Sequence, residues 1–356
     1  MEFASERIRS KEPIPETNHM KTKYLLAVIA AAFGALTILP TRVQANAIAY
    51  TVTHLGTLGG TADSYPLGIN ATGQIAGDSF LAGNSAIRAA RWTGTTPTNL
   101  GTLGGPESHA TGINATGQVA GYSSITGNTA IHATRWTGTT AQDLGTLGGS
   151  SSLGYDINDF GQVTGYSNLT GNSADHAVRW TGTTPTDLGT LGGSSSYGND
   201  INDSGQVAGW AFTLSNAKHA VLWTGTTPTD LGTLGGSLSA AYALNNAGDV
   251  IGLSYLAGDT VTHAFLYTGG TMYDLNDLIL PGSGVTNFSI SGFGGGINDS
   301  GQIAATDTIN GQRHALRLTP TPEPSSALLL LASTGLLAGF RRSRRTSPTP
   351  THPSLN

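Results

Sequence analysis

The stretch LGTLGG first occupies residues 55–60, and further copies start at Leu100, Leu144, Leu188 and Leu231. The copies follow one another at intervals of about 44 residues, so the chain contains an internal repeat of that length. Each unit also holds an Ile-Asn pair such as GIN, replaced by Leu-Asn at 244–245, a run such as GQVAG, and a run such as HATRW or HAVLW. Six such units fill residues 48–320, and a repeat of this period indicates a propeller or a solenoid.

The signatures of each unit are typical of short β-strands. In HAVLW, the side chains of His219, Val221 and Trp223 fall on one face of a strand and those between them on the other. Stretches such as ATG and DSG between the Ile-Asn pair and the GQVAG run indicate hairpin turns. Four short strands per unit predict an all-β, six-bladed β-propeller of four-stranded repeats. A β-solenoid is the alternative, because repeats of this size also stack linearly.

The order of the signatures at the two ends predicts a closed ring. The repeat region opens with a lone LGTLGG and ends with HALRL at 314–318, so one unit is divided between the ends. We expect residues 50–58 to supply the outer strand of the last blade, beside 314–318, which would leave no sheet edge exposed. LGTL is interpreted as the last strand of a blade, and the paired glycines as the corner toward the next blade.

Composition and charge exclude several classes of protein. The chain has 50 glycines and no cysteine, so disulfides, thiolate zinc sites and a thiol nucleophile are excluded. Residues 48–320 carry one lysine and six arginines against sixteen aspartates and one glutamate, a net charge of −10. A domain of that charge repels nucleic acid, so no nucleic-acid partner is expected.

The N-terminal region is typical of a secretory signal. Lys21 and Lys23 precede an apolar run at 25–39, and the small residues Ala45 and Ala47 follow it. A basic start, an apolar middle and an A-x-A-like end predict cleavage after Ala47 or, as second choice, after Ala45. The alternative is a buried helix, which the small-residue pattern disfavours.

The C-terminal region combines a Pro-Glu-Pro motif, an apolar run and an arginine cluster. The apolar run at 327–340 has 14 residues. As a helix it would reach about 21 Å, short of the roughly 30 Å hydrocarbon core, and the arginines suit a cytoplasmic flank. In this order the three parts resemble the PEP-CTERM sorting signal, also catalogued as an ice-binding-protein C-terminal domain. The residues that carry the resemblance are Pro322, Glu323, Pro324, Arg341, Arg342, Arg344 and Arg345.

The repeat signatures, with His-Ala-Phe intact at 263–265, resemble the HAF family of probable extracellular repeat proteins. That resemblance implies an exported bacterial repeat protein without an assigned activity, and it supplies no catalytic residues. The predicted organisation has four parts. These are an N-terminal extension and signal peptide at 1–47, the propeller at 48–320, the sorting signal with a short transmembrane helix at 321–345, and a disordered tail at 346–356.

No metal or cofactor is predicted. Equivalent histidines of successive blades lie around a ring instead of converging on one ion, so hydrogen bonds to neighbouring turns are the favoured interpretation. The stretches DINDFG at Asp156 and DINDSG at Asp200 have some character of a calcium loop, but later ligand positions hold residues such as Phe160, Ser204 and Ala211. A hairpin turn is therefore favoured over a calcium site at both positions.

One asymmetry among the repeats suggests a binding site. The position before the aromatic residue of the HAxxW run is arginine in four units and leucine in the other two. Arginine forks match carboxylates and indole faces stack on planar groups, so the set predicts a site for an acidic or planar sugar. The alternative is that these arginines only cover strand surfaces. The predicted binding residues are Arg91, Arg135, Arg179, Arg317, Trp92, Trp136 and Trp180.

Together these observations predict an exported cell-envelope or extracellular-matrix protein of a Gram-negative bacterium that binds and does not catalyse. The expected partners are the secretion machinery, an exosortase, an extracellular polysaccharide or matrix protein, and the membrane before processing. The first alternative is a structural matrix component without a specific ligand. The second is a propeller hydrolase or lyase, although no G-x-S-x-G or H-E-x-x-H motif is present.

Overall fold

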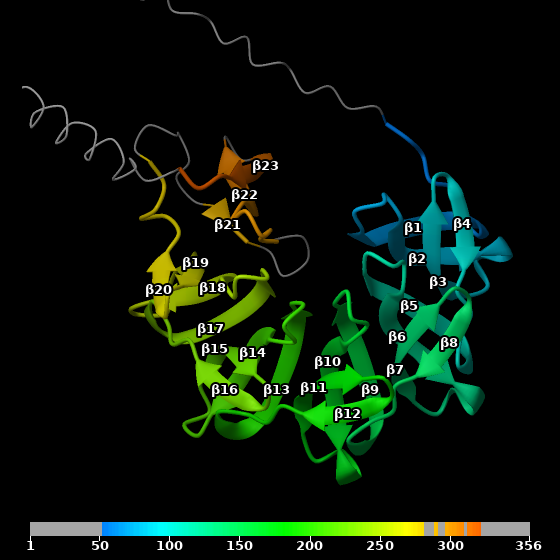
Figure 1. The fold of residues 1–356 in the computed structure, drawn as a ribbon, viewed down its shortest axis with the longest axis horizontal. Coiled ribbons are helices and arrows are strands. Elements are labelled where there is room, and N and C mark those ends of the chain that lie inside the picture. Colours follow the sequence, from blue (N-terminus) through cyan, green and yellow to red (C-terminus); the bar gives the residue numbers. More distant parts are fainter. Residues whose placement is uncertain (1–51, 281–287, 291–295, 310–311, 322–356) are drawn as a thin grey trace, which may run out of the picture. The chain divides into compact units, whose positions relative to one another are not determined.

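The computed structural model describes residues 52–280, 288–290, 296–309 and 312–321 (Figure 1). All described strands belong to one unit, Thr53–Asn356. Among the described residues the regular elements are β-strands and three 3-10 turns, η1 (Ala82–Asn84), η2 (Thr126–Asn128) and η3 (Thr170–Asn172). The predicted all-β class is confirmed.

The strands form six separate antiparallel sheets, which are the blades of a β-propeller (Figure 1). Blade 1 contains β1 (Gly59–Ile69), β2 (Ile75–Leu81), β3 (Ile87–Thr93) and β4 (Thr96–Asn99). Blade 2 contains β5 (Gly104–Ile113), β6 (Val119–Ile125), β7 (Ile131–Thr137) and β8 (Thr140–Asp143). Blade 3 contains β9 (Gly148–Ile157), β10 (Val163–Leu169), β11 (Asp175–Thr181) and β12 (Thr184–Asp187).

Blades 4 and 5 repeat this arrangement, and blade 6 has three described strands. Blade 4 contains β13 (Gly192–Ile201), β14 (Val207–Thr213), β15 (Lys218–Thr224) and β16 (Thr227–Asp230). Blade 5 contains β17 (Gly235–Leu244), β18 (Val250–Leu256), β19 (Thr262–Thr268) and β20 (Thr271–Asp274). Blade 6 contains β21 (Phe288–Ser289), β22 (Ile303–Ile309) and β23 (Gln312–Leu318). In every sheet the strands lie side by side in chain order, as in propeller blades.

LGTL is not the fourth strand of a blade, so that part of the prediction is wrong. The fourth strand is the short segment before it, such as β8, which pairs with β7. Gly145 then has φ of 71°, which ends the extended conformation. Leu147 lies parallel to Leu169 of the next blade, and its N–H donates to Ser167 Oγ at 2.8 Å. LGTL is therefore the connection between blades, and the paired glycines begin the first strand of the following blade.

The predicted pairing of residues 50–58 with 314–318 is not observed. Residues 50 and 51 lie outside the described residues, and residues 53–58 form no strand. Leu58 lies parallel to Leu81, and its N–H donates to Ser79 Oγ at 2.9 Å. Residues 55–58 thus contact the blade that follows them in the chain, as the other LGTL connections do.

The hydrophobic core lies in the interfaces between neighbouring blades. Ala120 and Ala133 of blade 2 pack against Ile157, Val163 and Trp180 of blade 3, all at most 5% exposed. We call the alanine-bearing side of a blade, which meets the following blade, its outgoing face. The opposite side, which carries the larger apolar residues, is its incoming face. Because both faces of an inner blade are covered, its strands bury side chains in both directions.

No helix within the described ranges is long and apolar enough to span a membrane. The helix predicted at 327–340 lies outside the described residues.

Candidate functional site: the central cavity

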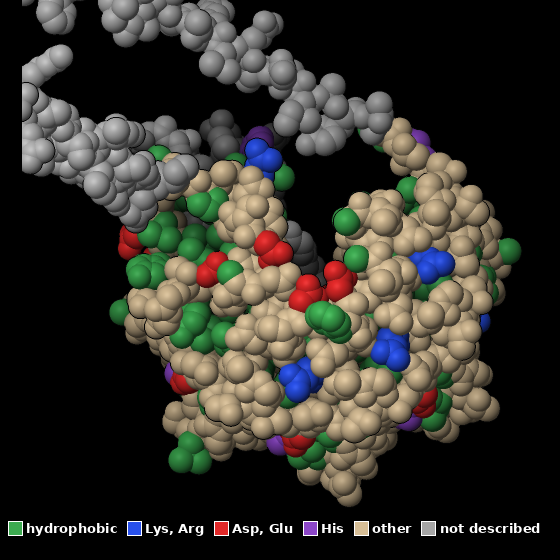
Figure 2. Space-filling model, viewed as in Figure 1, with side chains coloured by type: hydrophobic (Ala, Val, Ile, Leu, Met, Phe, Trp, Pro, Cys, Tyr) green, Lys and Arg blue, Asp and Glu red, His purple; other side chains and the backbone are tan. Residues whose placement is uncertain are grey.

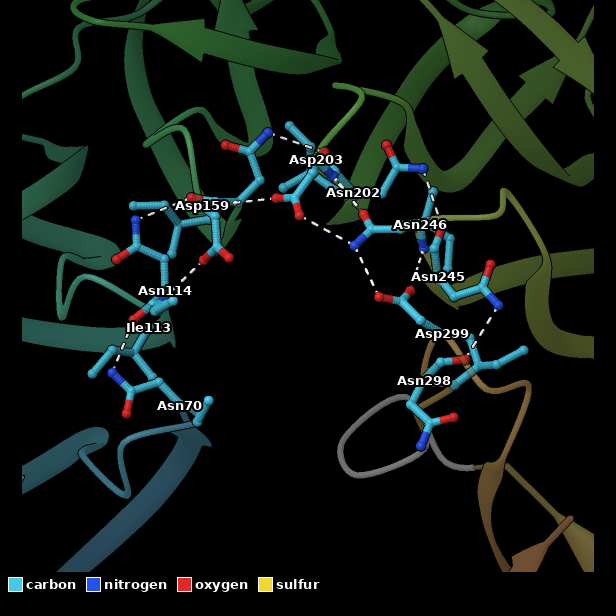
Figure 3. Close-up of a pocket in the computed structure, with 17 residues that line it drawn as sticks. Asn70, Ile113, Asn114, Asp159, Asn202, Asp203, Asn245, Asn246, Asn298 and Asp299 are labelled. Carbon is cyan, nitrogen blue, oxygen red and sulfur yellow. Dashed lines mark hydrogen bonds between the residues drawn. The ribbon is translucent and has the colours of Figure 1, made fainter.

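Six equivalent hairpin turns converge on one cavity of about 350 Å³ (Figure 3). Each turn connects the first and second strands of a blade and begins at an asparagine, for example Asn158 between β9 and β10. In that turn the N–H of Gly161 donates to the carbonyl of Asn158, and Gly161 has φ of 74°. The predicted hairpins are therefore confirmed, and they bring the polar residues of all six units together.

The turn asparagines hold their own turns and also join neighbouring blades. The Oδ1 atom of Asn158 accepts hydrogen bonds from the N–H groups of Phe160 and Gln162, at 3.2 and 2.9 Å. Its Nδ2 donates to Gln162 Oε1 at 2.9 Å and to the carbonyl of Asn202 in the next blade at 3.0 Å. The side chain is 4% exposed and uses both polar atoms, so it is a structural group and not a free ligand donor.

The same interblade bond occurs at five successive interfaces. Every bond runs from the side-chain amide of one blade to the main-chain carbonyl of the next, at 2.9–3.2 Å. The donor–acceptor pairs are Asn70–Asn114, Asn114–Asn158, Asn158–Asn202, Asn202–Asn245 and Asn245–Asn298. The asparagines thus form a chain of hydrogen bonds around the cavity.

The residues that follow the asparagines supply the polar groups available to a ligand. Asp159 Oδ1 accepts the N–H of Ala115 at 2.8 Å, and Asp203 Oδ1 accepts the N–H of Asp159 at 3.0 Å. The Nδ2 of Asn246 donates to the Oδ2 atoms of Asp203 and Asp299, both at 3.1 Å (Figure 3). In the described part of the chain, ion pairs join only histidines and aspartates elsewhere, so no basic side chain neutralises these three carboxylates.

Phe160 stands beside Asp159 in the turn of blade 3 and is 76% exposed. Equivalent positions hold Thr72 and Thr116, whose hydroxyls donate to the turn asparagine at 2.8 Å. Ser204 makes the same bond at 2.7 Å in blade 4. Blade 3 therefore exchanges a hydrogen-bonding hydroxyl for an exposed aromatic ring next to a cavity-lining carboxylate. Figure 2 shows acidic and hydrophobic side chains together around the central hollow.

Two further carboxyl groups belong to residues that directly precede cavity-lining residues in the chain. Asp156 and Asp200 precede the cavity-lining residues Ile157 and Ile201, and their side chains hydrogen-bond to each other. Burial, followed by the negative charge of Asp200, raises the pKa of Asp156 well above its ordinary value. Asp200 Oδ2 accepts the N–H of Leu244 at 2.8 Å. The pair joins blades 3, 4 and 5 through hydrogen bonds.

The tryptophan part of the predicted sugar site is wrong. Trp92, Trp136 and Trp180 are at most 1% exposed, because the neighbouring blade or the LGTL connection covers them. No indole face is left on which a sugar could stack.

The arginines of that site serve the interfaces between blades. The Nη1 atoms of Arg91, Arg135 and Arg179 donate to turn carbonyls of the following blade at 2.6–2.7 Å. Arg317, in blade 6, is exposed and is not brought together with a tryptophan. Ligand binding by these guanidinium groups stays a prediction.

The histidines bind neighbouring turns, as expected. In blade 3, His176 Nδ1 lies 2.9 Å from Asp187, whose Oδ1 also accepts the N–H of Gly189 at 2.8 Å. Blades 2, 4 and 5 repeat this pair with His132, His219 and His263. Within the residues that the structure describes, no group of three or more metal-binding side chains is found.

The remaining predicted functional residues lie outside the described residues. They are the cleavage-site residues Ala45 and Ala47 and the sorting residues Pro322, Glu323, Pro324, Arg341, Arg342, Arg344 and Arg345.

A comparison with known protein families supports the sorting signal. The family described as the PEP-CTERM protein-sorting motif matches residues 320–345. The match defines an exported protein that passes an exosortase step at the inner membrane and reaches the cell surface of a Gram-negative bacterium. No curated protein matches the chain.

Two solved structures illustrate the resemblance in fold. One is the β-propeller domain of the trilobed protease from Pyrococcus furiosus, with 10% identity, a TM-score of 0.49, and coverage of 72% of this chain and 83% of that one. The other is the six-bladed fungal lectin from Aleuria aurantia, with 16% identity, a TM-score of 0.35, and coverage of 74% and 97%. The four-stranded sheets of the chain itself define the propeller class.

Proposed function

We propose that this cell-surface propeller is a binding module without catalytic activity, and that its ligand occupies the central cavity. The observation that carries the proposal is the convergence of six equivalent turns on one cavity lined by amide and carboxylate groups. Ligand sites are typically concave and hold a few placed polar groups. The hydrogen bonds of the turn asparagines hold the cavity wall in place, and the carboxylate oxygens of the aspartates can accept hydrogen bonds from a ligand.

The chemistry of the wall favours a polyhydroxyl ligand without negative charge, namely a neutral saccharide. Carboxylate oxygens accept hydrogen bonds from hydroxyl groups, and charge-assisted bonds of this kind are the stronger ones. The uncompensated carboxylates of Asp159, Asp203 and Asp299 repel an acidic sugar, so the acidic polysaccharide expected from the arginine pattern is a poor fit to this cavity. Phe160 is not among the residues that line the cavity, but it follows Asp159 in the turn, and its exposed ring offers an apolar face to a part of the saccharide that extends beyond the cavity.

The proposal includes the parts of the chain that the structure does not describe. A leader at 1–47 is removed after Ala45 or Ala47, the propeller at 48–320 is the exported module, and the signal at 321–345 is processed with the tail at 346–356. We also propose that the propeller belongs to the HAF family, which its repeat signatures resemble. A structural matrix component and a propeller hydrolase or lyase are the competing functions.

A glycan array with neutral, amine-bearing and acidic saccharides tests the proposal. The test variants are Asp159→Asn and Asp299→Asn, because Asn246 already occupies the equivalent position in blade 5 and accepts the N–H of Asp203 at 2.9 Å. Each test variant therefore loses charge without losing its turn geometry, and we expect at least about tenfold weaker binding, the value of one charged hydrogen bond.

The matched control is Asp259→Asn. Asp259 has φ of 54° and accepts the N–H of Ser237, and Asn172 performs the same task in blade 3. This control removes the same charge away from the cavity and should bind like the parent. Equal binding by all variants would place the ligand elsewhere, and turnover of a saccharide would favour the hydrolase or lyase.

A further inference from the structure

Aromatic rings form a continuous row across blades 3 and 4. The ring centroids of Tyr155 and Tyr166 in blade 3 lie 5.8 Å apart, and Tyr166 lies 4.5 Å from Tyr197 of blade 4. Tyr197 stacks on Trp210 at 4.3 Å, and Phe212 meets Trp210 edge-on at 5.6 Å. We call these five residues the aromatic row. Its closest pair of tyrosines, Tyr166 and Tyr197, crosses the interface between two blades.

Two tyrosines face each other at only one of the first four interfaces. Tyr166 lies on the second strand of its blade and Tyr197 on the first strand of the next. The corresponding residues are Asp78 and His109 between blades 1 and 2, Tyr122 and Leu153 between blades 2 and 3, and Trp210 and Ala240 between blades 4 and 5. The other interfaces therefore form without a tyrosine pair, and the propeller fold does not require one.

Tyr197 has a proton acceptor in place. Its O–H donates to Asp175 Oδ2 of blade 3 at 2.5 Å. Burial, followed by this hydrogen bond, raises the pKa of Tyr197, so the phenol keeps its proton at neutral pH. A phenol becomes a strong acid when it loses an electron, and a carboxylate that already accepts its hydrogen bond takes up the proton. Asp175 therefore makes Tyr197 easier to oxidise than a tyrosine without such an acceptor.

The charge beside Trp210 acts in the opposite direction. Lys218 Nζ lies 3.9 Å from the centroid of the Trp210 ring. A cation over an indole is attracted to the electrons of the neutral ring, and it repels the positive charge that the ring acquires on oxidation. An electron lost from this stacked pair is therefore lost from Tyr197, whose other tyrosine neighbour is Tyr166.

We propose that Tyr166 and Tyr197 form a dityrosine cross-link when the exported protein meets a peroxide and a one-electron oxidation catalyst. Each ring gives up one electron and its phenolic proton, and the two phenoxyl radicals join through the ring carbons next to their C–O carbons. The hydrogens on the joined carbons then move to the two oxygens, which restores both phenols. The two electrons and two protons reduce one hydrogen peroxide to two waters. The rings are already neighbours, so the bond forms within one molecule.

Oxidation of the dilute full chain with a haem peroxidase and hydrogen peroxide tests the proposal. The product should be a monomer that is lighter by two hydrogen atoms and emits dityrosine fluorescence. After proteolysis, mass spectrometry should find the peptide of Tyr166 joined to the peptide of Tyr197. Tyr166→Phe and Tyr197→Phe each keep the ring and should lose the link. Oxidised protein whose links avoid these two residues would overturn the proposal.

Tyr65→Phe is the matched control. Tyr65 shares the proton acceptor, because its O–H donates to Asp63 Oδ2 at 2.8 Å, but it lies in blade 1 and is 50% exposed. Loss of Tyr65 should leave the yield of the internal link unchanged. Links that Tyr65 forms between molecules should increase with protein concentration, whereas the internal link should not. A yield in Tyr65→Phe as low as in Tyr166→Phe would contradict the assignment.

Two further variants test the charges. Asp175→Asn keeps a hydrogen-bond acceptor for Tyr197 but is a far weaker base, so the initial rate of cross-linking should fall at least about tenfold. Lys218→Gln should divert oxidation to Trp210 and lower the yield of the link. Unchanged rate and yield would overturn the assigned roles of Asp175 and Lys218.

Unfolding in urea tests whether the rings react in their native positions. A link that joins blades 3 and 4 restricts the unfolded chain, so the cross-linked monomer should unfold at a higher urea midpoint than the untreated parent. Tyr166→Phe carried through the same oxidation controls for other damage, and its midpoint should not rise. A lower midpoint for the cross-linked monomer would show that the rings leave their native positions to react, and it would overturn the proposed geometry.

Discussion

Removal of one buried turn asparagine should cost far more stability than removal of its exposed equivalent. Asn158→Ala deletes four hydrogen bonds, one of which crosses to the carbonyl of Asn202 in blade 4. Asn298→Ala deletes the same three bonds within its own turn, but in an exposed setting. The two variants therefore differ in burial and in the bond between blades.

The magnitudes follow from the burial of the partners. A buried donor or acceptor left unsatisfied costs about 1–3 kcal/mol, whereas water replaces a lost partner at an exposed turn. For Asn158→Ala we expect the free energy of unfolding to fall by about 3–4 kcal/mol, since several partners are stranded. For Asn298→Ala we expect a loss of about 1 kcal/mol.

Urea unfolding followed by tryptophan fluorescence measures both variants. Trp92, Trp136, Trp180 and Trp223 are buried between blades, so their emission reports loss of the interfaces. An unchanged m-value shows that the same amount of surface unfolds in parent and variant. Equal losses for the two variants would refute the reasoning, because the asparagine would then stabilise only its own turn.

Three further outcomes are expected. The raised pKa of Asp156 contributes stability that is fully present below the ordinary carboxyl pKa and is lost as pH rises through the raised value. Asp156→Asn keeps a hydrogen-bond partner for Asp200 but cannot ionise. The melting temperature of this variant should therefore not show that loss as pH rises. His109 Nδ1 donates a hydrogen bond to Asp78 Oδ2 at 2.7 Å, which raises the pKa of His109. The resulting stability is fully present below the ordinary histidine pKa and is lost as pH rises through the raised one. Asp78→Asn should flatten the melting temperature between about pH 5 and about pH 8, and a retained slope would contradict the assignment. Mass spectrometry of the exported protein should find a mature species cut near the Pro-Glu-Pro motif, and a mature species that keeps residues 346–356 in a strain with a working exosortase would contradict this.

The repeat pattern predicted the blades because each signature carries its own local physics. Alternating side chains specify strands, and an Asn-to-Gly stretch such as 158–161 specifies a hairpin with a residue at positive φ. LGTL was assigned wrongly because its apolar residues resemble those of a strand. The positive φ of Gly145 shows that the segment turns instead.

The candidate site was harder to predict, because the role of each side chain depends on whether a neighbouring blade covers the strand face on which it lies. Alternation separates the two faces of a strand, but in a propeller neighbouring blades cover both, so Trp136 and Trp180 are buried. The Ile-Asn pairs were visible at regular spacing, yet a sequence does not show that the amide of Asn158 reaches the carbonyl of Asn202. Only the meeting of turns about 44 residues apart creates the cavity.

The uniform direction of the asparagine bonds bears on how such a gene can change in length. Each unit contributes one amide that donates forward and one carbonyl that accepts from behind, as Asn114 does between Asn70 and Asn158. Duplication or deletion of one whole unit at the DNA level therefore adds or removes a matched donor and acceptor and leaves every other junction as it was. No compensating substitution is required in the asparagine chain at the new junction, so these hydrogen bonds do not fix the number of units.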